Sequence, residues 1–286
     1  MKLNHLTTLS ALLFLFYGCS VKRIQKKGDV QPSSFHSKLT FETHKTLIVL
    51  KANINGETKN LIFDTGADLS LIQRDSLIGN TSKFSGASKR KMKLGNEIVP
   101  LIEIGEAKFL NTYALNGNMV GLKEKIPNFG GLIGQSIISK ANWLIDYPNN
   151  VIEISNKTLI DTSYTKINIS TKDGAPYTSI EMNGKKYKVI IDFGSSSSIN
   201  LPENSEFATD VIKHVSLTQN TRDRYTLGGL QTVTEKVGII PTIILGDFVF
   251  KDVPVNLNIS SQPRIGVSFF RDYHIYIDNS EGEHTF

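Results

Sequence analysis

The chain contains an internal repeat, and this repeat limits the fold more than any other feature of the sequence. The segment LIFDTGADLSLI, from Leu61 to Ile72, has a counterpart in VIIDFGSSSSINLP, from Val189 to Pro202. In both segments, apolar residues lead into Asp-x-Gly and a small residue, and a second apolar stretch follows. Two copies of one unit in similar surroundings predict a chain made of duplicated halves.

The sequence before each Asp-x-Gly repeats as well. Asn55-Gly56 and Asn183-Gly184 each stand between alternating apolar segments, a strong pattern for a two-residue hairpin turn. Gly56 lies 8 positions before Asp64, and Gly184 lies 8 positions before Asp192. The equal spacing indicates that each half uses the same hairpin to deliver an aspartate.

Later landmarks keep the same order along the chain. KLGNE around Gly95 corresponds to TLGGL around Gly228, and LIGQ from Leu132 corresponds to RIGV from Arg264. We therefore expect one lobe at about residues 43–160 and the other at about 165–282.

Composition favours β structure. Strand-length runs rich in valine and isoleucine alternate with clusters of Gly, Asn and Asp. Hydrophobic residues make up 40% of the chain, which is enough apolar material for a sizeable core. We expect an all-β protein with two duplicated, barrel-like lobes and little helix.

The first residues have the pattern of an export signal. MKLNHLTTLSALLFLFYGCS has Lys2, an apolar run from Leu9 to Tyr17 that is short for a membrane span, and then Gly18-Cys19. This end resembles the lipobox of bacterial lipoproteins, which implies a signal peptide at 1–18 and a lipid on Cys19. The alternative is an ordinary secretory signal with a chance cysteine.

Residues 19–42 are interpreted as a lipidated tether, and Ser20 after the cysteine favours the outer membrane of the bacterial envelope. Cys19 is the only cysteine, so a disulfide within the chain is excluded. The formal net charge of +5 comes from Lys2 and from four basic residues shortly after Cys19. The rest of the chain is close to neutral, and the basic stretch would lie near anionic lipid head groups. We expect no nucleic-acid partner.

FDTGADLSLI, with an apolar-apolar-Gly segment further along, resembles the aspartic proteases, especially their retropepsin-like branch. The resemblance extends over residues 43 to 282 and is closer in the first half. It implies a bilobal acid-protease fold with a cleft between the lobes. It also implies a monomer, because both half-sites lie in one chain, and a peptide or protein substrate, with no cofactor and no metal.

By this resemblance, Asp64 and Asp192 are the catalytic pair, and Gly66 and Gly194 shape the two turns that carry them. Two carboxyls held close together cannot both ionise cheaply, so they share a proton. The ionised carboxylate takes a proton from water while the protonated one hydrogen-bonds the substrate carbonyl.

The neighbours of the two aspartates differ between the halves. Thr65 has the hydroxyl that the family places after the aspartate, whereas Phe193 does not, which leaves a catalytically weak protein open as an alternative. At the fourth motif position, Ser195 can hydrogen-bond its own aspartate but Ala67 cannot. We therefore expect Asp192 to carry the charge and Asp64 the proton.

Hairpins around Gly95-Asn96 and Gly228-Gly229 resemble the flaps that close over a bound peptide. We favour the first, at about residues 92–103, as the dominant flap.

Other chemistries are less well supported by the sequence. The serines at 195–198 lack a G-x-S-x-G pattern, and DFG at Asp192 has no kinase catalytic loop or Gly-rich loop before it. The six histidines show no zinc-binding spacing. Two functions remain: an envelope-anchored aspartic endopeptidase, or a weak or inactive protein of the same fold that binds extended peptides between its lobes.

Overall fold

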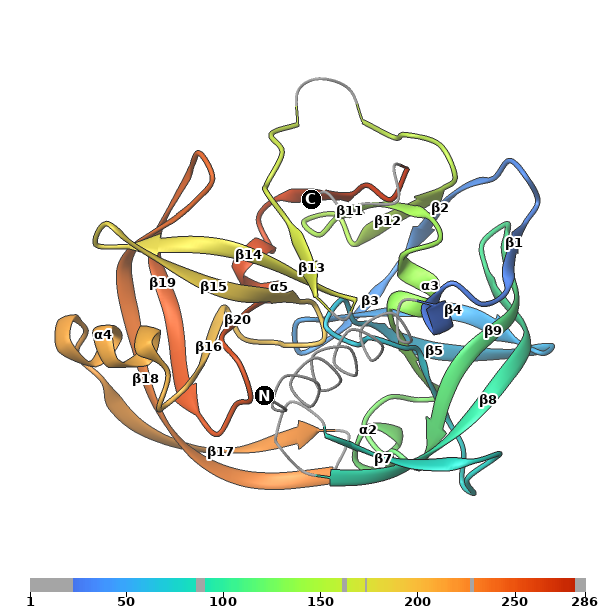
Figure 1. Ribbon diagram of the computed structural model, residues 1–286, viewed down its shortest axis with the longest axis horizontal. Coiled ribbons are helices and arrows are strands. Elements are labelled where there is room, and N and C mark those ends of the chain that lie inside the picture. Colours follow the sequence, from blue (N-terminus) through green and yellow to red (C-terminus); the bar gives the residue numbers. More distant parts are fainter. Residues whose placement is uncertain (1–22, 86–90, 161–163, 173, 227–228, 281–286) are drawn as a thin grey trace, which may run out of the picture.

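The computed structural model describes residues 23–85, 91–160, 164–172, 174–226 and 229–280 (Figure 1). Strands dominate these residues and the helices are short, so the expectation of an all-β protein is confirmed. Within the described ranges, every helix falls short of the length and apolar character needed to cross a bilayer.

The first large sheet comes from the first half of the chain. Its order is β1-β9-β6-β10-β5-β4-β8-β7, with β3 beside β4. Because β8 pairs with both β4 and β9, the strands from β9 through β6, β10, β5 and β4 to β8 close into a ring. The strands are β1 (Asp29–Gln31), β3 (Glu42–His44), β4 (Leu47–Ile54), β5 (Glu57–Phe63), β6 (Leu71–Gln73), β7 (Thr81–Ser85), β8 (Lys91–Ile104), β9 (Ala107–Gly117) and β10 (Phe129–Ile133).

The second large sheet comes from the second half and closes in the same way. Its order is β13-β14-β15-β20-β16-β19-β18-β17, and an added pairing of β14 with β18 completes the ring. The strands are β13 (Ser170–Lys172), β14 (Ala175–Met182), β15 (Lys185–Asp192), β16 (Ile199–Pro202), β17 (Thr218–Thr226), β18 (Gly229–Leu245), β19 (Phe248–Asn258) and β20 (Arg264–Gly266).

The two rings repeat one pairing scheme strand by strand. β10 lies parallel to β5 and antiparallel to β6, and β20 lies parallel to β15 and antiparallel to β16. The β4–β5 and β14–β15 hairpins turn at Asn55-Gly56 (φ 51° and 92°) and Asn183-Gly184 (φ 53° and 78°). Positive φ at both turn residues defines the turn that Asn-Gly favours, so both predicted hairpins are confirmed.

A four-stranded sheet joins the two halves, in the order β2-β12-β11-β21. It takes β2 (His36–Thr40), β11 (Asn142–Asp146) and β12 (Val151–Ser155) from the first half and β21 (His274–Ile277) from the end of the chain. Trp143 on β11 is fully buried, and its indole N–H donates to Ile138 O at 2.9 Å.

The prediction of a tether reaching residue 42 is wrong from residue 29 onward. Asp29–Gln31 pairs with β9, and His36–Thr40 pairs with β12. The alternating burial of residues 36–40 shows why: their polar side chains face outward while the backbone completes the edge of the joining sheet. Gln25 is also buried, and its amide donates to Asp68 O at 2.8 Å.

Besides the helical residues 23–25, the described ranges contain α2 to α5, and of these α3 and α5 come directly after β10 and β20 at equivalent places. They are α2 (Val120–Lys123), α3 (Gln135–Ile138), α4 (Glu206–His214) and α5 (Val267–Phe270). One continuous apolar core runs through both halves and includes Phe63, Trp143 and Phe193.

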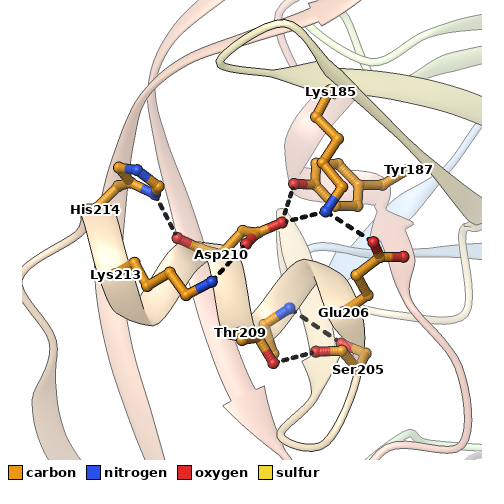
Figure 2. A network of polar contacts seen from close by, with 9 residues as sticks. Lys185, Tyr187, Ser205, Glu206, Thr209, Asp210, Lys213 and His214 are labelled. Atoms are coloured by element: carbon orange, nitrogen blue, oxygen red, sulfur yellow. Dashed lines mark hydrogen bonds and ion pairs between the residues drawn. The ribbon is translucent and has the colours of Figure 1, made fainter.

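Helix α4 is fixed to the β14–β15 hairpin by a polar network (Figure 2). Ser205 begins the helix, and its hydroxyl accepts from the Ala208 N–H at 3.1 Å. Asp210 accepts from Lys185 Nζ at 2.7 Å and from the Tyr187 hydroxyl at 2.6 Å. These bonds, that of Lys185 first, lower the pKa of Asp210. Tyr187 in turn stacks on Phe207, with ring centroids 4.2 Å apart.

Candidate active site

The two repeated aspartates occupy equivalent places in the two rings. Asp64 follows the last residue of β5, and Asp192 is the last residue of β15. Asp64 is anchored to the neighbouring strand, since its backbone N–H donates to Ile133 O at 2.9 Å. Asp192 has Gly266 as its register partner on β20. The strands therefore end where the Asp-x-Gly turns begin.

The glycines of the apolar-apolar-Gly segments support these turns, as the sequence suggests. A Cβ added to Gly134 would lie 2.8 Å from Ala67 O, and one added to Gly266 would lie 2.4 Å from Ser195 O. The same two carbonyls accept hydrogen bonds from the first residues of the short helices, Gln135 at 2.9 Å and Val267 at 3.0 Å. Ala67 and Ser195 thus hold their turns in place through backbone atoms.

The two turns face each other across a close contact. A Cβ added to Gly194 would lie 2.3 Å from Asp64 Cγ, and one added to Gly66 would lie 2.7 Å from Asp192 Cγ. Each carboxyl therefore packs over the glycine of the opposite turn, and any side chain there would collide with it. Residues 128 positions apart in sequence are brought together in this way.

Thr65 bridges the two turns. Its buried hydroxyl donates to Ile191 O at 2.8 Å and accepts from the Phe193 N–H at 3.0 Å. Gln135 holds the same residue from the other side, with its amide donating to Thr65 O at 2.8 Å. One threonine therefore makes both cross-turn bonds, and the backbone of Phe193 supplies a donor that its side chain lacks.

The Phe193 side chain has a packing role. It is fully buried, and its ring centroid lies 6.4 Å from that of Phe63 and 5.7 Å from that of Phe270. Phe63 belongs to the first half and Phe270 to the second. The aromatic residue thus ties the two turns to a shared core instead of hydrogen-bonding across them.

Burial, the negative charge of Asp192 and a hydrogen bond to the Asp192 carboxyl raise the pKa of Asp64 well above its usual range, in that order of importance. The Gly66 N–H, which donates to Asp64 Oδ1 at 2.9 Å, and the charge of Arg264 act in the opposite direction. The raised pKa favours the protonated form of Asp64.

The charge on Asp192 is compensated by Arg264, a residue that the sequence analysis did not select. Asp192 is 4% exposed, and its Oδ2 forms an ion pair with Arg264 Nη1. Arg264 is itself buried, and its Nη2 lies 3.3 Å from Ser261 Oγ. The proposed charge distribution thus has a different physical basis from the Ser195 hydroxyl on which the sequence argument rested. The one clue in the sequence was RIGV, where an arginine stands in place of the Leu132 of LIGQ.

The first flap prediction is wrong in detail. Gly95 and Asn96 lie inside β8, where Gly95 pairs with both Thr81 and Asn116, and not at a hairpin tip. A Cβ on Gly95 would meet Ile78 O at 2.3 Å, so this glycine allows a close backbone approach. The connection between β7 and β8 falls at residues 86–90, outside the described residues.

The second flap prediction agrees better with the structure. Gly229 begins β18 at the end of the β17–β18 hairpin with φ 95°, while Gly228 lies outside the described residues. Figure 1 shows this long hairpin extending from the second ring toward α2 of the first half. A Cβ on Gly121 of α2 would lie 3.4 Å from Gly229 Cα. The β17–β18 hairpin of the second half therefore contacts the first half at α2.

The structure says less about the predicted signal peptide, lipid anchor and metal binding. Cys19 and the signal peptide lie outside the described residues. In the parts of the chain that are described, no three His, Cys, Asp or Glu side chains form a group that could hold a metal ion. No protein-family model matches the chain, and no curated protein is similar to it. The candidate site therefore stands on its own geometry.

Proposed function

We propose that this chain is an aspartic-type endopeptidase in which Asp64 and Asp192 activate a water molecule. The two rings are then the lobes of an acid-protease fold with the dyad between them. The main support is the reciprocal packing of each carboxyl over the glycine of the opposite turn. The raised pKa of Asp64 favours its protonated form while Asp192 pairs with Arg264, which is the one-proton arrangement that such a dyad needs.

The proposed reaction follows from this proton distribution. Asp192 takes a proton from the attacking water while Asp64 gives its proton to the carbonyl oxygen, which yields a tetrahedral diol. The C–N bond then breaks as the amide nitrogen takes the proton held by Asp192, and one diol hydroxyl returns a proton to Asp64. The products are a carboxylic acid and an amine, and both carboxyls regain their starting states.

In this reaction, Thr65 and the two glycines position the catalytic carboxyls. The Thr65 hydroxyl fixes the backbone on both sides of Asp192, at Ile191 and Phe193. Gly66 lets Asp192 Oδ1 come to within 2.7 Å of where its Cβ would be. Arg264 pairs with the other oxygen of this carboxylate, Oδ2, so Oδ1 is the oxygen that lies against the turn carrying Asp64.

One observation favours a second candidate function, a peptide-binding protein that does not cleave. The buried Arg264 guanidinium forms an ion pair with Asp192 Oδ2, so this carboxylate oxygen is engaged by a protein cation instead of a water molecule. In this candidate, extended peptides bind between the lobes without turnover.

Proteolysis by the full-length chain in mild detergent separates the two candidates. A mixed peptide library is incubated between about pH 3.5 and 7.5, and products are identified by mass spectrometry. Asp64→Asn and Asp192→Asn serve as variants, with the exposed Asp272→Asn as a control for loss of a carboxylate. Cleavage that falls at least about a hundredfold in both site variants, and persists in the control, supports the peptidase. Saturable binding without cleavage by folded wild-type protein supports the second candidate.

We further propose that the protein acts as a monomer in the bacterial envelope, held by a lipid on Cys19, at the outer membrane. The support is the sequence pattern around Gly18-Cys19 and the basic residues that come after it. Metabolic labelling with a fatty acid tests this: label is expected on the wild-type chain and absent from Cys19→Ser. Label that persists in Cys19→Ser would contradict the anchor.

A further inference from the structure

The β17–β18 hairpin carries two arginines on one face. Arg222 and Arg224 are separated by one residue on β17, so they lie on the same side of the strand. Both arginines are half-buried, whereas Asp223 between them and Thr221 before them are exposed. This inner face of the hairpin also includes the buried Glu235 on β18.

Glu235 accounts for the charge of only one of these arginines. Its fully buried carboxylate pairs with Arg222 through Nε and through Nη2 at 3.3 Å. The same carboxylate accepts from the side-chain amides of Asn256 at 2.8 Å and Asn258 at 3.0 Å. Glu235 is therefore saturated, and it fixes the inner face of the hairpin against β19.

Arg224 is left as a surplus positive charge. Among the residues that the structure describes, it forms no ion pair, while Arg222 pairs with Glu235 and Arg264 with Asp192. Desolvation, followed by the like charges of Arg264 and Arg222, lowers the pKa of Arg224, and the charges of Glu235 and Asp192 partly offset this effect. Arg224 therefore lies within electrostatic range of Asp192 and Arg264.

Arg264 also has a hydrogen-bond donor that is not satisfied. It is 7% exposed, and within the described part of the chain its buried Nε has no hydrogen-bond partner. A buried guanidinium N–H without an acceptor is unfavourable, and a desolvated cation is stabilised best by an anion. Because Asp192 pairs with Arg264 and the raised pKa of Asp64 favours its neutral form, the charge of Arg224 is left to meet an incoming carboxylate.

We propose that Arg224 and Arg264 form a carboxylate-binding subsite beside Asp192, which selects peptides with an Asp or Glu side chain close to the bond held at the dyad. The planar guanidinium of Arg224 matches a carboxylate with two parallel N–H···O bonds. This subsite deepens the proposed peptidase function and rests on it. It gives that function a substrate class, acidic peptides.

The test uses pairs of labelled peptides that differ only by Glu against Gln, with the acidic residue placed in turn at each position of one apolar parent sequence. Binding to the full-length wild-type protein is measured by fluorescence anisotropy, and cleavage by mass spectrometry. We expect the best Glu peptide to exceed its Gln twin by about tenfold in affinity or in kcat/KM at low salt. The ratio is expected to fall as KCl rises.

Variants identify the residue responsible. Arg224→Gln should bring the ratio of Glu-peptide to Gln-peptide affinity or kcat/KM close to one. Arg224→Lys should keep part of this preference, since lysine supplies the positive charge without the two parallel N–H donors of a guanidinium. Lys251→Gln, which removes an exposed positive charge on β19, should leave the ratio unchanged. Thermal melts of every variant confirm that the comparison is made on folded protein.

The outcomes separate the subsite from the proposed function. Selective binding of Glu peptides without cleavage supports the subsite and overturns the peptidase. Equal cleavage of Glu and Gln twins, or a ratio that survives Arg224→Gln, overturns the subsite and leaves the peptidase standing. Neither binding nor cleavage of any peptide overturns both.

Discussion

Replacing the Thr65 hydroxyl tests how the two halves are joined at the site. Thr65→Val keeps the shape of the side chain but removes the oxygen that donates to Ile191 O at 2.8 Å and accepts from the Phe193 N–H at 3.0 Å. Both partner residues are fully buried, so water cannot replace the lost bonds. Each buried backbone group left unsatisfied costs about 1–3 kcal/mol, which gives about 2–6 kcal/mol for the two groups that Thr65→Val leaves unpaired.

Thr65→Ser is the matched comparison because it keeps the hydroxyl and loses one buried methyl group, worth about 1 kcal/mol. The measurement is equilibrium unfolding of the full-length variants in urea, with the slope m checked for constancy. We expect the valine variant to be the less stable of the two by at least about 1 kcal/mol. Equal stability of the two variants would refute the argument, since the hydroxyl would then contribute nothing beyond its volume.

Four other substitutions test the candidate site and the polar network of α4. Asp64→Asn should stabilise the protein at neutral pH, because the raised pKa of Asp64 means that ionisation disfavours the folded state once the pH exceeds the unfolded pKa of about 3.9. The gain should disappear in melts recorded below that pH, and a pH-independent gain would contradict this cause. Gly194→Ala should abolish any activity that Asp64 supports, since its Cβ would lie 2.3 Å from Asp64 Cγ; an activity close to wild type would disprove the close approach. Arg264→Met should cost about 3–5 kcal/mol in denaturant unfolding because it leaves Asp192 as a buried, unpaired charge, and an unchanged midpoint would argue against the ion pair. Asp210→Asn should lower the melting temperature above about pH 4, where the lowered pKa of Asp210 makes its ion pairs stabilising, and this difference should shrink in more acidic buffer. A pH-independent difference would point to packing instead.

Much of the local structure could be predicted from the sequence because it depends on neighbouring residues. Asn-Gly pairs are among the few dipeptides that adopt positive φ at both positions without strain, so both hairpins follow from the sequence. The repeated order of apolar segments likewise leads to two rings with the same strand pairing. The place of Asp64 and Asp192 at equivalent strand ends comes from the same repeat.

The errors concern interactions between distant parts of the chain. Residues 29–42 look like a tether because their side chains are largely polar, yet their backbone supplies edge strands, a role that hydrophobicity does not reveal. Gly95 looks like a turn residue because glycine favours turns, but here it makes room for the backbone of Ile78.

The sequence by itself determined the β class, the duplication and the two aspartates, because turn chemistry and apolar periodicity act over a few residues. Tertiary structure alone decided that Arg264 neutralises Asp192, that one threonine bridges both turns and that Arg224 has no carboxylate partner among the described residues. Such pairings depend on which buried groups meet after two halves of the chain have packed together. In a low-dielectric interior, the contacts between these buried groups determine which charge is compensated and which has no partner within the described residues.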